Sequence, residues 1–339
     1  MDQDRLDYLA QIAVWYYEER LDQETIAGRI SKSRSMVSRL LDQAREAGLV
    51  EVKVRFPLRT DAALEQRLCD EFGLAHAQVL AEPPDDYRLL LKRLGELGAR
   101  CLQQALRPGV IIGISWGTAV HEVVSAMPST PVPDSTVVQL IGAVGHGDPL
   151  VDGAELGRWL AQKLHASFRF LSAPLLVEDE AVAAALRRER TIEETLAMGK
   201  RADVALIGIG TPQPELSSLV RAGYLSRSEI ESLMASGVVG DIVAHQFDEN
   251  GNWLDIPANR RAISLDAESL RRIPRVIAVS GGVSKARAIL AGLRGRYCTC
   301  LVTDAWAAQT VLELQRQSVV AHGATGCRPL NHASGTTRN

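Results

Sequence analysis

The 339-residue chain has few of the features that mark secreted, membrane-spanning or metal-binding proteins. Its five cysteines are scattered, which is not the pattern of a disulfide framework in a chain of this length. Cys298 and Cys300 form a C-x-C pair, but no second pair or nearby histidine completes a zinc site. No apolar run approaches the ~20 residues that span a bilayer, and the acidic N-terminal sequence MDQDRLDYLA is unlike a signal peptide. We therefore expect a cytoplasmic protein that holds no metal and no cofactor.

The chain also lacks a large excess of charge. Its net charge is −3 at pH 7, with 46% hydrophobic and 23% charged residues, which is ordinary for a globular protein with ample core. The charge is unevenly distributed, because an eleven-residue span without an acid contains Arg29, Lys32, Arg34 and Arg39. Phosphate contacts supply most of the nonspecific affinity of proteins for DNA. This local charge therefore favours DNA as a partner more than the chain total does.

The basic span lies within residues 22–56, whose pattern is two short helices followed by a strand. Asp22 and Ser33 are placed to cap the two helices, since their side-chain oxygens can accept from free amides of the first turn. The second helix has one apolar stripe at the spacing i, i+3, i+4, i+7, formed by Val37, Leu40, Leu41 and Ala44. Gly48 ends it, and alternating apolar residues from Val50 to Phe56 predict a half-buried strand. This pattern is typical of a winged helix-turn-helix.

A helix-turn-helix places the first turns of its second helix in the major groove of DNA. The candidates for base-edge and phosphate contacts lie on the polar side of that helix and beside it: Gln23, Lys32, Arg34, Ser35, Met36, Ser38 and Arg39. An amphipathic helix over residues 4–19 would pack against the two helices. The alternative interpretation is a helical hairpin inside a protein core, which would not need the acid-free cluster of basic residues.

The rest of the chain alternates between apolar strands and helices. Near-continuous β-branched runs predict strands at 110–114, 137–144, 203–210, 275–282 and 298–304. Helices are expected after several of them, near 154–164, 284–293 and 305–314. Strands of this kind, separated by helices, indicate a parallel α/β sheet that is covered on both faces. We expect a helix-turn-helix domain at 1–56, a linker at 57–60, a large α/β domain at 61–316 and a disordered tail at 317–339.

Two glycine-rich turns follow strands of this sheet, at the edge where parallel α/β sheets bind their ligands. The first, GISWGT at 113–118, opens directly into a helix. Its glycines allow close backbone approach, its hydroxyls can donate, and a helix N-terminus offers free amides to a phosphate. The second turn, at 280–285, adds the positive charge of Lys285. Each turn by itself is equally compatible with a tight connection that binds nothing.

Two enzymatic alternatives use the same residues. The motif around Ser115, G-x-S-x-G, matches the nucleophile elbow of α/β-hydrolases, whose triad could be completed by Asp304 and His322. No HGGG-like segment precedes Ser115 to form an oxyanion hole, however. A sugar-phosphate isomerase could instead use Lys285 with Asp241 or Asp304 for proton transfer. A binding pocket explains both turns with fewer additional requirements.

Taken together, the motifs resemble the SorC family of bacterial sugar-binding transcriptional regulators, over the chain from about Leu6 to Leu314. The N-terminal signature is WYYEERLDQETIAGRISKSRSMVSRLLDQAREAGLVEVKV. The signatures of the larger domain are GISWGTAV, VVQLIGAVG, ADVALIGIGTP, GDIVAHQFDENGN, SGGVSKARAILAGLRG and LVTDAWAA. Within the family, the sequence is nearest in appearance to the deoxyribonucleoside-type regulators.

The resemblance implies an effector domain related to glucosamine-phosphate deaminases and ribose-phosphate isomerases, used for sensing and not for catalysis. It implies a sugar phosphate, or a sugar or polyol, as the effector, and a homotetramer that binds operator DNA and regulates a carbohydrate-catabolism operon. It further implies phosphate contacts in the first glycine-rich turn, a charge partner at Lys285, and contacts to the sugar end from Asp304 and Arg261. The complete set of expected effector-binding residues is Gly113, Ser115, Gly117, Thr118, Arg261, Gly281, Gly282, Lys285 and Asp304.

Three positions depart from the family pattern. Ala119 stands where many relatives carry a second hydroxyl residue, which removes one phosphate donor. Ile141 leaves its strand without a lysine that could form a Schiff base with a sugar aldehyde. His245 stands where an arginine would otherwise face the ligand. These departures leave both phosphorylated and free sugars open as effectors.

Overall fold

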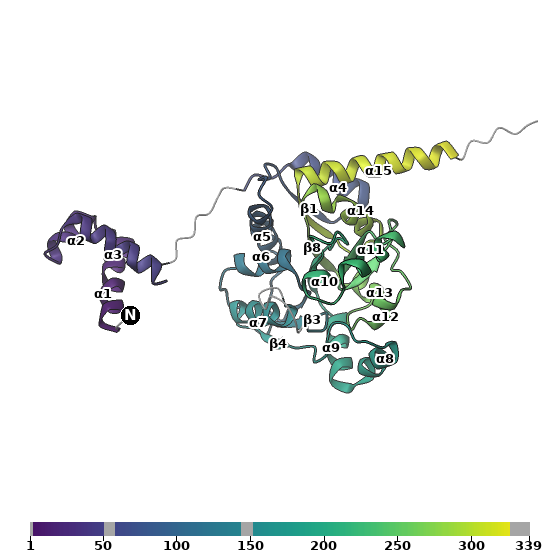
Figure 1. The fold of residues 1–339 in the computed structure, drawn as a ribbon, viewed down its shortest axis with the longest axis horizontal. Helices are drawn as coiled ribbons and strands as arrows, with labels where there is room; N and C mark the ends of the chain where they lie inside the picture. The colour runs from purple at the N-terminus through teal and green to yellow at the C-terminus, as the bar shows by residue number, and fades with distance from the viewer. Residues whose placement is uncertain (1–2, 51–57, 144–151, 326–339) are drawn as a thin grey trace, which may run out of the picture. The chain divides into compact units, whose positions relative to one another are not determined.

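The computed structural model describes residues 3–50, 58–143 and 152–325, and the chain divides into two units after Pro57 (Figure 1). The first unit contains α1 (Gln3–Ala13), the π-helical turn η1 (Val14–Glu18), α2 (Gln23–Arg29) and α3 (Arg34–Glu46). Its core is formed by Leu9, Ile12, Ala13, Ile26, Ala27, Val37, Leu40, Leu41 and Ala44. The apolar stripe predicted for the second helix is therefore the stripe that α3 buries. Most of the predicted wing strand, residues 51–56, lies outside the described part of the chain.

Both predicted helix caps of the first unit are present. The Asp22 carboxylate accepts a hydrogen bond of 2.7 Å from the Thr25 amide. The Ser33 hydroxyl accepts one of 3.3 Å from the Met36 amide. Beyond α3, Gly48 takes a left-handed φ of 72°, a conformation that glycine adopts without steric cost. The predicted helix-turn-helix is confirmed in its caps, its core stripe and its end.

The second unit is built on a seven-stranded sheet in the order β1-β9-β8-β5-β2-β3-β4, in which every neighbouring pair is parallel. The strands are β1 (His76–Leu80), β2 (Ile111–Ile114), β3 (Thr136–Gln139), β4 (Ser167–Arg169), β5 (Val204–Gly208), β8 (Arg275–Val279) and β9 (Cys300–Asp304). Five of them coincide with predicted apolar runs. The prediction missed β1 and β4, the two edge strands, because edge strands are less completely buried and their sequences are more polar.

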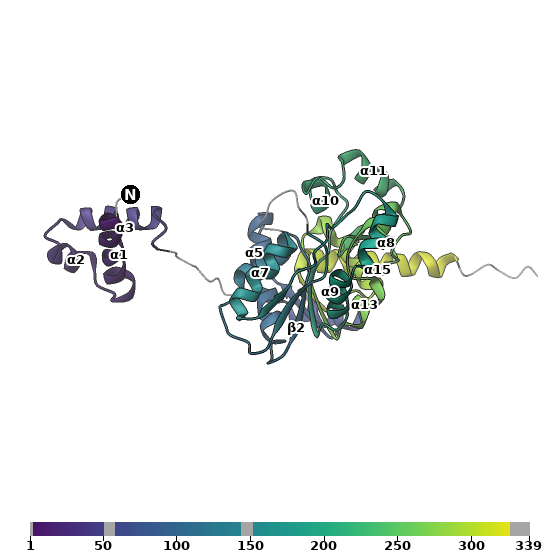
Figure 2. The same cartoon turned by 90° about the horizontal axis from the view of Figure 1, so that it is seen from below.

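Helices cover both faces of the sheet, as predicted (Figures 1 and 2). One layer contains α5 (Tyr87–Gln103), α6 (Thr118–Ala126) and α7 (Gly153–Leu164), and the other contains α4 (Ala62–Phe72), α9 (Arg190–Lys200), α13 (Ala267–Arg272), α14 (Ala286–Arg294) and α15 (Ala305–Thr325). Successive residues of β5 alternate between the two cores: Val204 and Leu206 pack toward the first layer, Ala205 and Ile207 toward the second. Burial on both faces explains the unbroken apolar run in this strand.

Smaller elements lie beyond these layers. They are α8 (Glu180–Arg188), α10 (Ser218–Arg221), α11 (Arg227–Ala235), α12 (Pro257–Arg261), the one-turn 3-10 helix η3 (Val283–Lys285) and the antiparallel hairpin of β6 (Gly240–Ile242) and β7 (His245–Phe247). The hairpin turn has φ values of 45° at Val243 and 66° at Ala244. A β-branched residue is strained in this left-handed region, so the surrounding structure must hold the turn in place.

The helix α15 differs most from its predicted extent. It was expected to end near Leu314, with a disordered tail from 317, whereas it continues to Thr325. The physical reason is that residues 315–325 contain good helix formers such as Gln315 and Arg316 and no proline. Residues 317–325 of the predicted tail are therefore helical, and residues 326–339 lie outside the described part.

The described residues contain neither a membrane-spanning helix nor a metal-binding cluster. No helix among them is both long and apolar enough to cross a membrane. Likewise, no group of three or more histidine, cysteine, aspartate or glutamate residues within the described ranges is arranged to hold a metal ion.

His245 in β7 is a buried histidine with a fixed environment. Its ring stacks on Trp253, with the ring centroids 4.0 Å apart, and its Nδ1 lies 3.0 Å from the Ser264 hydroxyl. Burial lowers the pKa of His245 from 6.5 to about 4. The native state therefore keeps this imidazole neutral under conditions where the unfolded chain would protonate it.

This difference predicts a pH dependence of stability. Because the native pKa is the lower one, the contribution of His245 is complete above pH 6.5 and is lost as the pH falls from 6.5 toward 4. In urea unfolding between pH 7 and 4, the wild type should lose about 3 kcal/mol more free energy of unfolding than His245→Gln. Parallel pH profiles of the two proteins would contradict a neutral buried His245.

Candidate DNA interface and effector pocket

The basic residues of the N-terminal unit fall into two groups, of which the first stabilises the unit itself. Arg5, Arg29 and Arg45 each lie over an aromatic ring of the unit, at 5.4 to 5.9 Å from its centroid. The Arg45 guanidinium also donates to the Tyr17 hydroxyl at 2.9 Å. These side chains connect α1, η1, α2 and α3, and their charge is engaged within the unit.

The second group is exposed and has no hydrogen bond or ion pair within the described residues: Arg20, Lys32, Arg34 and Arg39. Arg20 lies between η1 and α2, whereas Lys32, Arg34 and Arg39 lie in the turn before α3 and in α3 itself. Ser35 and Met36 are exposed on the first turn of α3 beside them. The remaining two predicted contacts, Gln23 and Ser38, are half-buried on α2 and α3. The turn before α3 and the start of α3 therefore present unpaired cations on the surface that a helix-turn-helix places in the major groove.

A pocket of the second unit lies at the carboxyl ends of β2, β5 and β8, where ligands of parallel sheets bind. Its cavity volume is about 30 Å³, within a hollow of about 400 Å³ that includes open solvent. Its wall is formed by Ser115, Trp116, Gly117, Thr118, Ala119, Gly208, Ile209, Gly210, Ser218, Asp241, Val243, Val279 and Lys285. These residues come from the turns after the three strands, from the β6–β7 hairpin and from α10.

Lys285 of η3 and Asp241 of β6 are the charged groups of this wall. Lys285 is 8% exposed, and its ammonium donates to the Ile209 carbonyl at 3.2 Å. Burial lowers the pKa of Lys285 to about 8, while the Asp241 carboxylate acts in the opposite direction. Burial also raises the pKa of Asp241 to about 6, against the effect of Lys285. Within the described chain no ion pair of 4.0 Å or less joins the two.

The hydroxyls of Ser115 and Thr118 complete the polar wall. Gly117, with a φ of 107°, turns the chain between them into the start of α6. Neither hydroxyl makes a hydrogen bond to another described residue. Free hydroxyls at a helix N-terminus beside a buried lysine form a site that suits a phosphate.

A second cation lies near the pocket. Arg221 of α10 donates to the hydroxyl of Ser218, a wall residue, at 3.2 Å. Its positive charge further lowers the pKa of Lys285. The wall therefore holds one cation and one carboxylate, and a second cation lies beside it, a balance that favours an anionic ligand.

Four predicted effector residues line the pocket: Ser115, Gly117, Thr118 and Lys285. Three other predicted effector residues do not line the pocket and instead hold η3 in position: Gly281, Gly282 and Asp304. Asp304 is fully buried and accepts hydrogen bonds from the amides of Gly282, at 2.6 Å, and Ala307, at 3.0 Å. A Cβ atom on Gly281 would lie 2.5 Å from the Asp304 carboxylate. The geometry therefore gives these three residues the task of holding Lys285 in place.

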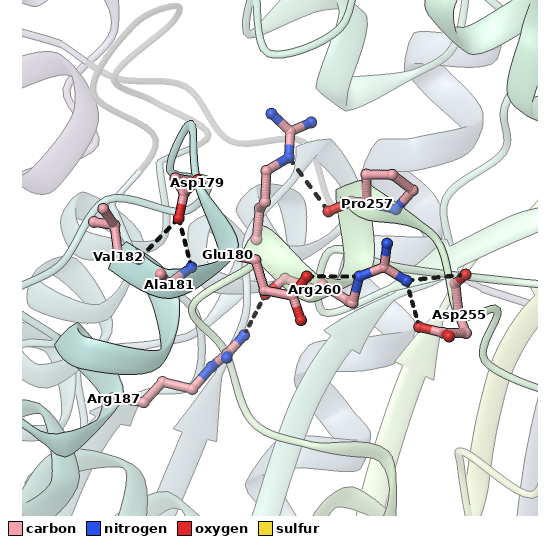
Figure 3. Close-up of polar contacts among 9 residues, drawn as sticks. Asp179, Glu180, Ala181, Val182, Arg187, Asp255, Pro257 and Arg260 are labelled. Atoms are coloured by element: carbon pink, nitrogen blue, oxygen red, sulfur yellow. Dashed lines mark hydrogen bonds and ion pairs between the residues drawn. The ribbon is translucent and has the colours of Figure 1, made fainter.

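Gly113 and Arg261, also predicted to bind the effector, do not belong to the pocket wall. Gly113 lies within β2, where a Cβ would meet the Leu140 side chain at 2.8 Å. Arg261 ends α12, and its Nε donates to the Pro257 carbonyl at 3.3 Å. In Figure 3 the neighbouring residue, Arg260, lies between two carboxylates, those of Glu180 and Asp255, at 2.9 and 2.7 Å. The end of α12 thus connects to α8.

His245, expected near the ligand, is buried against Trp253 instead.

Sequence reasoning missed the importance of Asp241 as a binding residue and named it only for a catalytic alternative. Its carboxylate lies directly over Gly210, where a Cβ would be 2.0 Å from Asp241 Oδ1. The signal in the sequence was the pair of glycines after β5, in GIG at 208–210, which leave space for another side chain. Ser218 gave no signal, because α10 is short and follows an irregular segment.

The geometry does not support the hydrolase alternative. No histidine is part of the pocket wall formed by the described residues, so Ser115 has no imidazole partner there. Each oxygen of Asp304 accepts a hydrogen bond from a backbone amide, and its described partners include no histidine.

Comparisons with known proteins agree with a regulator. A family model named Sugar-bind, with the description "Putative sugar-binding domain", matches residues 57–313. The deoxyribonucleoside regulator of Bacillus subtilis (strain 168) is 32% identical over 312 residues, which cover 92% of this chain and 99% of that protein. The sorbitol operon regulator of Klebsiella pneumoniae is 30% identical over 318 residues, covering 91% and 99%. The crystal structure of the full-length Klebsiella regulator SorC matches with a TM-score of 0.68, at 30% identity over 91% of this chain and 100% of that one.

The chain belongs to the SorC family of transcriptional regulators. This regulator binds DNA, contains a sugar-binding domain and is not an enzyme. The glycine-rich turns that resembled a nucleophile elbow and an isomerase site are parts of that sugar-binding domain. The predictions of family, fold class and regulatory function are confirmed.

The two groups of arginines predict different effects of substitution on DNA binding. Arg34→Ala and Arg39→Ala should each weaken binding to operator DNA at least tenfold in fluorescence anisotropy. Where the lost contact was to a phosphate, the slope of log K against log salt concentration should become smaller by about one. Arg45→Ala, on the same helix but bonded to Tyr17, is the matched control and should change the affinity little. Equal losses in all three variants would show that the effect is one of folding and not of contact.

The contact between Gly210 and Asp241 predicts a specific loss in the pocket. Gly210→Ala must displace the Asp241 carboxylate, because its Cβ would overlap Oδ1, and should weaken effector binding at least tenfold in calorimetry. Gly292→Ala is the control: its Cβ meets Ile209 and Ile242 at an ordinary 3.4 Å in α14. Normal effector affinity in Gly210→Ala would remove Asp241 from the site.

Proposed function

We propose that this regulator controls a carbohydrate-catabolism operon and that a phosphorylated sugar or polyol in the pocket sets its affinity for operator DNA. The observation that supports this most directly is the convergence of the free Ser115 and Thr118 hydroxyls with Lys285 in one buried pocket. The hydroxyls and Lys285 suit the phosphate, and Asp241 suits sugar hydroxyl groups, which a carboxylate accepts. Ala119 leaves the phosphate with one donor fewer than a second hydroxyl residue would provide.

On the DNA side, α3 is the recognition helix, and the predicted contacts are Gln23, Lys32, Arg34, Ser35, Met36, Ser38 and Arg39. Two of the relatives are named a deoxyribonucleoside regulator and a sorbitol operon regulator. We extend to this chain only the shared chemistry, a polyhydroxylated small molecule.

The protein acts in the cytoplasm, as a homo-oligomer that we propose to be a tetramer.

Thermal unfolding of the purified protein tests the effector assignment. Sugar phosphates are compared with the corresponding free sugars and polyols. A ligand at ~100 times its dissociation constant should add about 2.7 kcal/mol to the free energy of unfolding. We expect stabilisation by a phosphorylated compound. Stabilisation by the free sugar alone would contradict the phosphate assignment and leave the regulator function standing.

Lys285→Met provides the matched variant. The Asp241 carboxylate loses its opposing charge in this variant, so the unfolding midpoint of unliganded Lys285→Met is measured first, as the reference for its ligand shift. The shift caused by the phosphorylated ligand should disappear, and binding to operator DNA should remain. A ligand shift that persists in Lys285→Met would exclude Lys285 from the site.

A further inference from the structure

Met36 is an apolar side chain on the part of α3 that a helix-turn-helix places in the major groove of DNA. The other large apolar side chains of this helix, Val37, Leu40 and Leu41, are buried, whereas Met36 is 38% exposed. Met36 belongs neither to the core of the unit nor to the partly buried residues packed against that core. Packing within its own unit therefore does not explain this side chain.

The first turn of α3 holds the backbone of Met36 in a fixed place. Its amide donates to the Ser33 hydroxyl at 3.3 Å and to the Ser33 carbonyl at 2.9 Å. The Ser33 hydroxyl also lies 2.9 Å from that of Ser35, so both serines are engaged in the cap. The methionine side chain has three rotatable bonds and a polarisable sulfur, which let it adapt to a neighbouring surface. A fixed backbone with an adaptable apolar side chain suits an external partner.

The charges around Met36 indicate that this partner is DNA. Arg39 lies one turn further along the same face of α3, at the spacing i, i+3, and Lys32 and Arg34 precede Met36. All three cations are exposed and have no hydrogen bond or ion pair within the described residues. An apolar side chain among unpaired cations fits a polyanion that also displays apolar groups.

This unpaired surface ends soon after Arg39. On the following turn, Asp42 accepts a hydrogen bond of 3.0 Å from Arg45, and Gln43 accepts one of 2.6 Å from Arg5. The polar side chains of that turn are thus engaged within the unit. The part of α3 that is free to read bases is therefore confined to its first two turns.

The major groove displays one kind of apolar group. All four bases present hydrogen-bond donors or acceptors there, and thymine adds a C5-methyl group that the other three lack. A thioether sulfur is only a weak acceptor, so Met36 is a poor reader of donors and acceptors. It can distinguish bases by burying a methyl group against its own apolar surface.

We propose that Met36 reads a thymine in each half-site of the operator by packing against its C5-methyl group. The inference rests on the DNA contacts of α3 proposed above. Lys32, Arg34 and Arg39 hold the helix against phosphates and polar base edges, and Met36 adds a preference for thymine at one position. Met36 thus determines sequence specificity, while the cations supply most of the affinity.

Removal of single methyl groups from DNA tests this contact. The probe is the tightest duplex that the full-length protein selects from a random pool. Each thymine in it is replaced in turn by deoxyuridine, which differs only in lacking the C5-methyl group. In fluorescence anisotropy, one replacement in each half-site should weaken binding of the wild type about fourfold, the effect of one buried methyl group. The other replacements should have little effect.

The variant Met36→Ala connects this loss to one side chain. It should bind the thymine and deoxyuridine duplexes equally, because the shortened side chain no longer covers the methyl group. Met36→Leu keeps an apolar surface and should retain most of the preference. Leu49→Ala is the matched control, since Leu49 is exposed by 39% in the same unit but lies beyond the end of α3. It should keep the fourfold difference.

Two results would overturn the inference: a wild type that is insensitive to every thymine methyl group, or a Met36→Ala variant that keeps the fourfold preference. Arg34→Ala on the same duplex separates this failure from a failure of the DNA contacts themselves. A loss of affinity in Arg34→Ala would leave the DNA contacts of α3 standing without the role of Met36. Normal affinity in Arg34→Ala as well would contradict the assignment of α3 as the recognition helix.

Discussion

A buried lysine ammonium with no carboxylate in contact is the constraint around which the effector pocket is built. Lys285 makes one hydrogen bond to the Ile209 carbonyl, and its nearest opposite charge, Asp241, is beyond ion-pair distance. Burying charges in this way costs stability unless partners compensate. Two features keep the arrangement in place: Asp304 holds the turn before Lys285 through the Gly282 amide, and Gly210 leaves space for Asp241. A ligand that contacts both Lys285 and Asp241 would supply the partners that these charges lack. Much of its binding energy would then come from these two contacts.

The arginines of the DNA-binding unit also differ in whether their charge has a partner within the protein. Arg45 is bonded to Tyr17 and contributes to the packing of the unit, whereas Arg34 and Arg39 remain free on the first turns of α3. An unpaired cation on an exposed helix start has no structural task, and its charge is available for phosphates or base edges. Both units therefore keep selected polar groups unsatisfied at the positions where a partner binds, and satisfy the others internally.

Local features of the structure could be predicted from sequence, and long-range ones could not. The caps at Asp22 and Ser33 and the central strands depend on neighbouring residues or on continuous apolar runs, so their pattern is visible in the chain. Lys285 and the Ser115 turn were found because glycine-rich turns after strands are local signals. Asp241 reaches the pocket through a hairpin whose strands are three residues each, and its position depends on Gly210, thirty-one residues earlier. Asp304 was placed at the correct edge, but only the structure shows that backbone amides occupy both of its oxygens.

The central claim is that effector binding in the pocket changes the affinity for operator DNA. Thermodynamics then requires that operator DNA change the affinity for the effector by the same factor. The most direct measurement is a closed cycle by calorimetry and anisotropy: effector affinity with and without operator DNA, and operator affinity with and without effector. We expect the two factors to be equal and larger than about fivefold in the wild type. An operator affinity that does not change when the effector saturates the wild-type pocket would contradict the claim.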